Sequence, residues 1–261
     1  MGDRRVRTAD HATDAALANR LAVDAGALLL ELRRSGPSGR ELGGCGDATA
    51  QRLLAEQLAR LRPDDAVLSE EAADDAARLA ARRVWIIDPL DGTREYGEPG
   101  RRDWAVHVAL WADGDLVAGA VALPAAGLVH STAPAAVVSA RRAGRFRIAV
   151  SRTRPPALVH ALAGELDAEL VPIGSAGVKA TAVLRGEVDA YVHAGGQYEW
   201  DSAAPVAVCV AAGLHASRID GSALRYNQPD PRLPDLVVCR PEDAGRLLGA
   251  ISAHISEEVV A

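Results

Sequence analysis

The run from Val84 to Thr93 constrains the fold more than any other part of this sequence. Its first four residues, Val84-Trp85-Ile86-Ile87, are apolar and mostly β-favouring, which predicts a short buried strand. The chain then becomes polar at once, with Asp88, the turn-setting Pro89 and Asp91. The sequence therefore predicts a strand that ends in a turn carrying two carboxylates.

These two carboxylates are three residues apart, a spacing that suits a cluster of hard cations. Mg²⁺ takes oxygen ligands, and proteins usually hold it with one or two carboxylates together with the phosphates of a substrate. Gly92 can adopt backbone angles that other residues avoid, Thr93 is a residue type that caps helices, and N–H groups at a helix start favour an anion. An Asp-Pro-x-Asp-Gly run is also a good turn that binds nothing, so the segment by itself leaves the metal site open.

Two other acidic motifs do not fit. An EF-hand loop carries a Glu at its twelfth position, and the twelfth residue counted from Asp88 is Pro99. Phosphatases of the haloacid dehalogenase type have one residue between their two carboxylates, whereas Asp88 and Asp91 are separated by two.

Composition narrows the function classes. The 261 residues suffice for one large domain or two tightly joined ones, with an ordinary 49% of hydrophobic and 25% of charged residues. A net charge of −6 and a pI near 5.7 argue against a nucleic-acid polymer as partner. Cys45, Cys209 and Cys239 are odd in number and form no CxxC, which argues against disulfides and zinc. No apolar run is long enough to span a bilayer, so we expect no membrane and a cytoplasmic location.

The first half, residues 1–135, combines predicted helices with antiparallel strands. The predicted elements are a helix over 13–34, a loop over 35–46, a helix opened by Asp47, a strand over 67–69 that runs into Glu70, and a helix over 72–82. Asp47 could simply be the N-cap of its helix. Asp113-Gly114 lies between strand-like runs at 104–111 and 116–123, which predicts a hairpin and an α+β half.

The pattern changes in the second half, residues 136–261, where strands and helices alternate. Strands are predicted over 147–150, 170–173 and 188–193, with helices over 156–166, around Lys179 and over 202–212. This alternation predicts an α/β layer set. No long linker separates the halves, so we expect them to pack as one unit.

Four acids stand at predicted strand ends or helix starts: Glu70, Asp88, Asp91 and Asp201. Side chains at such positions can converge at the edge of a sheet, where α/β folds tend to place their sites. Chemistry by two metal ions about 3.5–4 Å apart needs several carboxylates of this kind. The sequence alone leaves open whether Asp201 comes near Asp88.

Three blocks of the sequence resemble the signature set of the inositol monophosphatase superfamily. In chain order they are Glu70-Glu71, Trp85 to Thr93, and Glu199-Trp200-Asp201-Ser202-Ala203-Ala204. Members of that superfamily are Mg²⁺-dependent, lithium-sensitive phosphomonoesterases, so the resemblance implies the layered αβαβα sandwich that they share with fructose-1,6-bisphosphatase. The Glu-Trp-Asp block and Arg94-Glu95-Tyr96 are similar to those of 3′(2′),5′-bisphosphate nucleotidases, in particular the actinobacterial CysQ type. Those enzymes remove the 3′-phosphate of 3′-phosphoadenosine 5′-phosphate, a by-product of sulfate activation.

The resemblance implies two or three Mg²⁺ ions and in-line attack by metal-activated water, without a covalent phosphoenzyme. By position, Glu70, Asp88 and the carbonyl of Leu90 would hold one ion. Asp88, Asp91 and Asp201 would hold the second. Glu70, Leu90, Asp91 and Asp201 would also face the substrate.

The resemblance also implies roles next to the metal ions. Gly92 and Thr93 would offer backbone N–H groups to the phosphate, and Asp47 would orient the Thr93 hydroxyl so that the pair activates the water. Many relatives have a Pro-Val-Thr-x-Ala-Asp run with an upstream lysine at this Asp. The present sequence departs from that pattern with Gly43-Gly44-Cys45-Gly46-Asp47 and no lysine.

Specificity is expected to come from the second half, because a metal core recognises only a phosphate. Gly174 and Ser175, at a predicted helix start, could supply N–H groups to a 5′-phosphate, and Lys179 lies one turn into that helix. Tyr198 stands three residues before Asp201 and could offer an aromatic wall to adenine. The alternatives are that Tyr198 packs in the core and Lys179 points to solvent.

The expected partner is thus a small phosphorylated nucleotide, and the expected assembly is a homodimer, as is common in the family. Inositol 1-phosphate and fructose 1,6-bisphosphate remain alternative substrates, because the same metal core serves all of them. A non-catalytic regulator that binds metal and anion is the remaining alternative.

Overall fold

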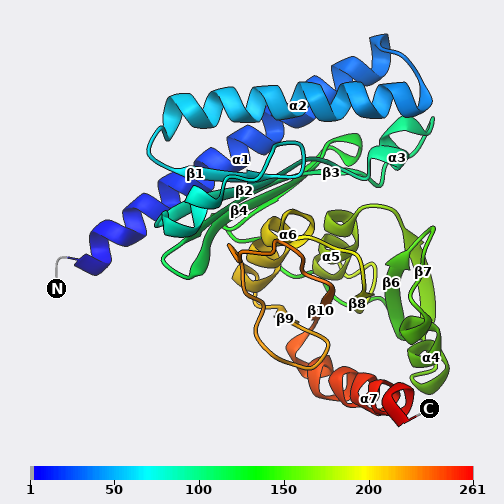
Figure 1. Cartoon of the computed structure of the whole chain (residues 1–261). Helices are drawn as coiled ribbons and strands as arrows, with labels where there is room; N and C mark the ends of the chain where they lie inside the picture. Colours follow the sequence, from blue (N-terminus) through cyan, green and yellow to red (C-terminus); the bar gives the residue numbers. More distant parts are fainter. Residues whose placement is uncertain (1–2, 261) are drawn as a thin grey trace.

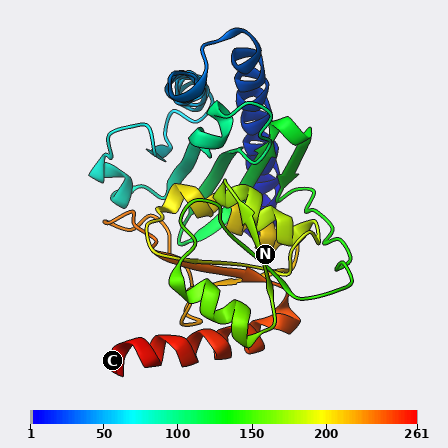
Figure 2. The ribbon, with the colours of Figure 1, turned by 90° about the vertical axis from the view of Figure 1, so that its right-hand side faces the viewer.

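Helices and sheets alternate in five layers in the computed structural model, which describes the backbone of residues 3–260 and the side chains of residues 13–255 (Figure 1). The outer layer of helices holds α1 (Asp3–Ser35) and α2 (Gly39–Leu61), the middle layer holds α5 (Ala176–Leu184) and α6 (Glu199–Ala211), and the opposite outer layer holds α4 (Ala157–Glu165) and α7 (Pro241–Val260). One five-stranded sheet lies in each gap between helix layers, as the turned view in Figure 2 also shows. The predicted αβαβα sandwich is confirmed.

The first sheet has the strand order β1-β2-β3-β4-β5. Its strands are β1 (Ala66–Ser69), β2 (Arg83–Asp91), β3 (Ala105–Ala112), β4 (Asp115–Leu123) and β5 (Leu128–Ser131), and a 3₁₀ turn, η2 (Pro124–Ala126), precedes β5. β1 and β2 are parallel, and the other pairs are antiparallel. The predicted hairpin is confirmed between β3 and β4, where Asp113 and Gly114 both have positive φ, 51° and 106°.

The second sheet has the order β7-β6-β8-β10-β9. Its strands are β6 (Arg147–Ser151), β7 (Glu169–Ile173), β8 (Ala190–Ala194), β9 (His215–Ser217) and β10 (Asp235–Cys239). β6 pairs in parallel with both β7 and β8, as alternating strands and helices predict, while β9 and β10 add an antiparallel edge. The division of the chain at residue 135 stays a prediction.

Strand β2 is covered on both faces because it is apolar on both faces. Trp85 and Ile87 pack into the core under α1 and α2, while Val84 and Ile86 pack into the core around α5 and α6. Successive side chains of a strand point to opposite faces, so a continuous apolar run fits a strand covered on both sides. This burial fixes the position of the acidic segment that follows Ile87.

Several predicted boundaries were wrong. The segment 39–46 is not a loop, because α2 begins at Gly39 and carries Asp47 in its interior, so Asp47 is not an N-cap. Residues 72–82 form only a 3₁₀ turn, η1 (Ala76–Ala80). There the buried guanidinium of Arg78 is held by Asp74 and by Asn227, 2.8 Å away, which pins the segment to a distant loop. Strand β2 continues through Asp88 to Asp91, and Gly92 rather than Thr93 caps α3 (Thr93–Gly97).

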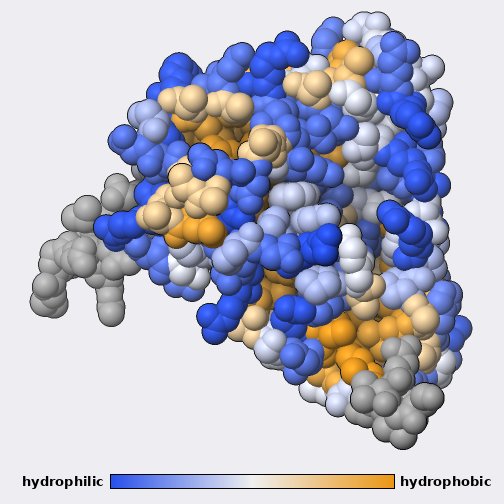
Figure 3. Space-filling view, in the orientation of Figure 1, coloured by the Kyte–Doolittle hydropathy of each residue, from blue (hydrophilic) through white to orange (hydrophobic). Residues whose placement is uncertain are grey.

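Among the described residues, no helix is both long and apolar enough to cross a bilayer. Figure 3 shows mostly hydrophilic side chains on the visible face, with smaller apolar areas between them.

Candidate active site

A register shift in β2 brings Asp88 and Asp91 to the same side of the sheet. Residues three apart on a regular strand point to opposite faces. Here Asp88 pairs with His107, whereas Asp91 pairs with Ala105, so β2 carries one residue more than β3 across this interval. The irregularity is stabilised by the backbone N–H of Leu90, which donates to Asp88 Oδ1 at 3.0 Å.

Asp91 is held by several donors from the second half of the chain. Its Oδ2 accepts a hydrogen bond from the Ser175 hydroxyl and one from the backbone N–H of Gly177, at 2.8 Å. His107 Nε2 lies 3.2 Å from the same oxygen. Burial acts to raise the pKa of Asp91, but His107, Lys179 and Ser175 outweigh it and hold the pKa below its usual range. Asp91 is therefore a carboxylate that is held in place through its Oδ2.

His107 links three elements of the site. Its ring, on β3, is 0% exposed, and Nδ1 lies 3.1 Å from the carbonyl oxygen of Trp200 in the first turn of α6. Burial acts to lower the pKa of His107, and the contact with Asp91 more than reverses this and raises it. No motif in the sequence had pointed to His107. The signal was a lone polar residue inside the apolar run 104–111, in the strand next to Asp88.

The structure gathers the four acids of the predicted metal site. Asp88 is fully buried, and its pKa is raised well above the usual range by burial and by the charges of Glu70, Asp91 and Asp201. Burial of its carboxyl group and the charge of Asp201 raise the pKa of Glu70 to about 7, although the residue as a whole is exposed to solvent. Burial and the charge of Asp91 raise the pKa of Asp201 to about 6. Asp201 thus lies close enough to Asp88 to act on it, which the sequence had left open.

This donor set fits divalent cations with a preference for oxygen. Carboxylates that raise one another's pKa are poorly compensated by the protein alone, and bound cations would remove that repulsion. Asp88, Asp91 and His107 each offer one ligand atom within 4.8 Å of the others. Since Asp91 Oδ2 and His107 already contact each other, we assign ligation to the carboxylate oxygens, the hard donors that Mg²⁺ prefers.

Mg²⁺ should stabilise the fold more at pH 8 than at pH 5.5. Glu70 and Asp201 have raised pKa values, about 7 and about 6, so they are protonated at pH 5.5 and a cation must displace those protons. At pH 8 they are ionised, and Mg²⁺ at ~100 times its Kd should raise Tm by roughly 5 °C or more. Thermal denaturation at both pH values, with NaCl of equal ionic strength as the control, measures this difference. An equal shift at both pH values would contradict the assignment.

Asp47 reaches this site from α2. Its Oδ1 lies 3.3 Å from the hydroxyl oxygen of Thr93, and that hydroxyl is also 3.2 Å from the carbonyl oxygen of Leu90. Burial and the charge of Glu71 raise the pKa of Asp47 to about 7, against the opposing hydrogen bond from Thr93. A carboxylate with this pKa, beside a hydroxyl, can accept a proton near neutral pH.

Asp103 holds the backbone at the start of α5. The backbone N–H of Gly174 donates to Asp103 Oδ2 at 2.8 Å, and that of Ser175 donates to the Asp103 carbonyl at 3.2 Å. These N–H groups are therefore hydrogen-bonded inside the protein, and a role of Gly174 and Ser175 in binding a 5′-phosphate stays a prediction. Ser175 also serves Asp91 through its hydroxyl. Asp103, which precedes β3, was not identified from the sequence.

Lys179 and Tyr198 occupy different environments. Lys179 is 4% exposed, donates from Nζ to the Gly174 carbonyl at 2.6 Å and lies over the ring of Tyr191, so it does not point to solvent. Tyr198 is half-buried and stacks on Trp200, with ring centroids 4.7 Å apart and planes 5° from parallel. Its backbone N–H donates to Asp201 Oδ2 at 2.7 Å, so the stacked pair is tied to a predicted metal ligand.

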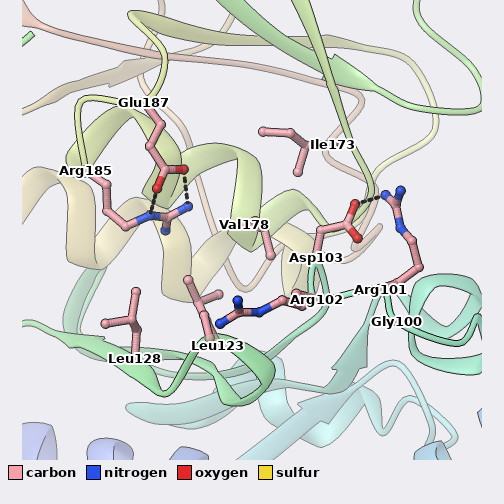
Figure 4. A pocket seen from close by; sticks show the side chains of 11 residues that line it. Gly100, Arg101, Arg102, Asp103, Leu123, Leu128, Ile173, Val178, Arg185 and Glu187 are labelled. Atoms are coloured by element: carbon pink, nitrogen blue, oxygen red, sulfur yellow. Dashed lines mark hydrogen bonds and ion pairs between the residues drawn. The ribbon is translucent and has the colours of Figure 1, made fainter. Parts of the chain in front are cut away.

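A pocket of about 450 Å³ lies on the Asp103 side of α5 (Figure 4). Arg101, Arg102, Asp103 and Arg185 line it, and Arg101 and Arg185 are paired with Asp103 and Glu187. None of the four clustered acids lines it, so it is separate from the acidic site.

The sequence matches the Inositol monophosphatase family over residues 9–257. It is 56% identical to the 3′-phosphoadenosine 5′-phosphate phosphatase of Mycobacterium leprae over 253 residues, which cover 92% of this chain and 93% of that protein. It is 33% identical to the 3′(2′),5′-bisphosphate nucleotidase CysQ of Escherichia coli K12, over 69% of this chain and 77% of that protein.

Solved structures agree on the fold. Mycobacterium tuberculosis SuhB superposes with a TM-score of 0.70 at 26% identity, over 93% of this chain and 96% of SuhB. CysQ from Bacteroides thetaiotaomicron, described as a bacterial member of the inositol monophosphatase family, gives a TM-score of 0.76 at 24% identity, over 87% of this chain and 97% of that one. From its sequence, its layered fold and its acidic centre, this chain belongs to the inositol monophosphatase family.

Proposed function

We propose that this protein is a Mg²⁺-dependent phosphomonoesterase that converts 3′-phosphoadenosine 5′-phosphate to AMP and phosphate, in the cytoplasm and in the course of sulfate assimilation. The observation that carries the proposal is the convergence of Glu70, Asp88, Asp91 and Asp201, whose charges raise the pKa values of the first, second and fourth of them. The chain is also 56% identical to a phosphatase of that name. The enzyme class is a 3′(2′),5′-bisphosphate nucleotidase.

The chain's own residues would divide the work as follows. Glu70, Asp88 and the Leu90 carbonyl would hold one ion, and Asp88, Asp91 and Asp201 a second. When bound there, Mg²⁺ lowers the pKa of water and neutralises charge on the phosphate oxygens.

The water-activating pair comes from two elements. Thr93, at the start of α3, would orient the attacking water, and Asp47 of α2 would accept its proton through the Thr93 hydroxyl, in keeping with their 3.3 Å separation. Gly92 and Thr93 would direct backbone N–H groups at the phosphate. His107, Ser175 and Gly177 would keep Asp91 ionised and oriented through their contacts with its Oδ2.

Recognition of the nucleotide is assigned to the first turn of α6 and to α5. The half-exposed stack of Tyr198 on Trp200 offers an aromatic face beside Asp201, where a base can pack. Lys179 of α5 brings a buried positive charge near Asp201, whose pKa it acts to lower, and its bond to the Gly174 carbonyl leaves two ammonium N–H groups for other acceptors.

Phosphate release from three substrates tests the proposal. With Mg²⁺ the protein should hydrolyse 3′-phosphoadenosine 5′-phosphate with a kcat/KM at least about 10-fold above those for inositol 1-phosphate and fructose 1,6-bisphosphate. Both competitors lack a base to stack, worth about 1–3 kcal/mol, and inositol 1-phosphate also lacks a second phosphate, worth roughly 1.5–3 kcal/mol. Removing Mg²⁺, or adding millimolar Li⁺ as the family resemblance implies, should suppress the rate. Preference for a sugar or inositol phosphate would favour the alternative enzyme, and no release from any substrate would favour a metal-binding regulator.

The Tyr198→Ala variant makes the same assay specific for base recognition. It should lose several-fold in kcat/KM on the nucleotide and little on inositol 1-phosphate, because only the nucleotide has a base to stack, at about 1–3 kcal/mol per stacked base. Equal losses on both substrates would show that the aromatic pair positions α6 instead of reading the base.

We further propose a homodimer. The exposed apolar residues Val23 of α1 and Leu128 and Val129 of edge strand β5 line one groove, which supports an apolar contact surface there. Light scattering after size-exclusion chromatography measures the assembly.

A further inference from the structure

Helix α2 contains three glycines immediately before Asp47. Gly43, Gly44 and Gly46 all lie within the helix Gly39–Leu61, although glycine is the least favourable residue after proline in a helix interior. Gly43 and Gly46 are buried, whereas Gly44 is exposed. Local helix stability therefore cannot explain why Gly43 and Gly46 stand in this helix. The explanation must lie in the residues that pack against them.

The two buried glycines face the turn that carries the candidate site. A Cβ on Gly43 would lie 2.8 Å from the Thr93 methyl carbon Cγ2 and 3.3 Å from the Thr93 carbonyl oxygen. A Cβ on Gly46 would lie 2.8 Å from both Leu90 Cδ2 and Tyr96 Cε1. A Cβ on Gly44 would meet nothing within 4 Å. Only the two glycines that face the turn are needed for close approach.

The neighbours of these glycines have little freedom to move away. The Tyr96 hydroxyl donates to the Leu29 carbonyl at 2.7 Å, and its ring packs edge-on against Trp104. One turn beyond Asp47, Gln51 accepts a hydrogen bond of 2.7 Å from Ser69, at the end of β1, so α2 is also tied to the first sheet. An added Cβ would therefore push α2 and the turn apart locally.

We infer that Gly43 and Gly46 are positioning residues, whose missing Cβ atoms let α2 approach the turn closely enough for Asp47 to reach the Thr93 hydroxyl. The inference rests on the proposed function, in which that pair activates water. It also explains how a glycine-rich helix can serve in place of the Pro-Val-Thr-x-Ala-Asp run of many relatives: the helix itself presents Asp47, provided that it lies against Thr93 at van der Waals distance.

Three Gly→Ala variants with the same chemical change test this inference. Gly43→Ala and Gly46→Ala should lower kcat by about 10-fold or more with little change in KM, since a misplacement of about 1 Å can cost up to 100-fold. Gly44→Ala should keep the wild-type kcat and raise Tm by about 2 °C, because alanine favours the helix and touches nothing else. A wild-type kcat in both Gly43→Ala and Gly46→Ala would overturn the inference.

Thr93→Ser distinguishes positioning from general damage. It removes the methyl carbon that a Cβ at Gly43 would strike and keeps the hydroxyl, so the Gly43→Ala/Thr93→Ser double variant should recover at least about 5-fold in kcat over Gly43→Ala. Gly46→Ala should not be rescued, because its neighbours are Leu90 and Tyr96. A double variant no better than the single one would refute the proposed contact.

The same variants separate this inference from the proposed function. If the wild-type protein released no phosphate from any substrate, the proposed function would fail, while the packing would still be read from Tm. Gly43→Ala should then lower Tm, Thr93→Ser should restore part of that loss, and Gly44→Ala should raise Tm. Equal Tm changes in Gly43→Ala and Gly44→Ala would show that the missing Cβ atoms do not set the approach of α2.

Discussion

Replacing Asp88 with asparagine should lower kcat by more than the roughly 10- to 100-fold that loss of an outer-shell partner of a metal typically costs. Asp88 lies at the centre of the cluster, where Glu70, Asp91 and Asp201 all raise its pKa, and it is the carboxylate assigned to both ions. An amide has nearly the same shape but cannot supply two anionic oxygens. Phosphate release at saturating Mg²⁺ measures the loss.

Thermal denaturation serves as the companion measurement. Because asparagine removes one of several repelling charges, Asp88→Asn without Mg²⁺ should be at least as stable as the wild type, and its Tm should no longer rise with Mg²⁺. Asp115→Asn, an exposed position at the start of β4, is the matched control and should retain both activity and the Mg²⁺ response. If Asp88→Asn kept a tenth of the wild-type kcat with saturating Mg²⁺, the two-ion assignment would be wrong.

Gly177→Ala should abolish most activity through a purely steric effect. A Cβ at this position would lie 2.0 Å from His107 Nε2, and both residues contact Asp91 Oδ2. His107 is completely buried and cannot swing away, so we expect a loss of about 1–3 kcal/mol in the free energy of unfolding from overpacking. Displacing the donors of Asp91 should lower kcat about 100-fold, as for outer-shell partners of metals.

Denaturant unfolding and phosphate release would measure these two effects. Gly164→Ala in α4, where a Cβ would meet nothing within 4 Å, is the control and should not reduce either quantity. In the Gly177→Ala/His107→Ala double variant, removing the ring relieves the clash, so stability should partly return while activity stays low. Full activity in Gly177→Ala would show that the His107 ring is not needed where the structure places it.

The fold was largely predictable because its central pattern is local. The run Val84-Trp85-Ile86-Ile87 predicts a strand buried on both faces, and Asp113-Gly114 predicts a hairpin, since both depend on neighbouring residues only. The start of α2 was mispredicted for a physical reason. Glycine disfavours helix locally, and the close packing against Thr93 that makes Gly43 acceptable in a helix is a tertiary contact.

The acids of the candidate site could also be identified from sequence, but their supports could not. Carboxylates at strand ends follow from pattern, whereas His107 acquires its role only when β3 pairs with β2 and α6 packs across both. Lys179 shows the same limit. Its side chain is buried through contacts with Tyr191 and the Gly174 carbonyl, and the sequence alone does not show that these groups surround it.

The distribution of the acids over separate elements has a consequence for how the protein folds. Glu70 follows β1, Asp88 and Asp91 end β2, and Asp201 sits on α6, between the two sheets. No fragment that contains only one sheet and its strand ends holds all four of these acids. A partly folded chain therefore lacks the complete set of carboxylates proposed to bind the cations. In the proposed two-ion site these like charges meet only when α6 has packed on the first sheet, so bound divalent cations would stabilise that packing.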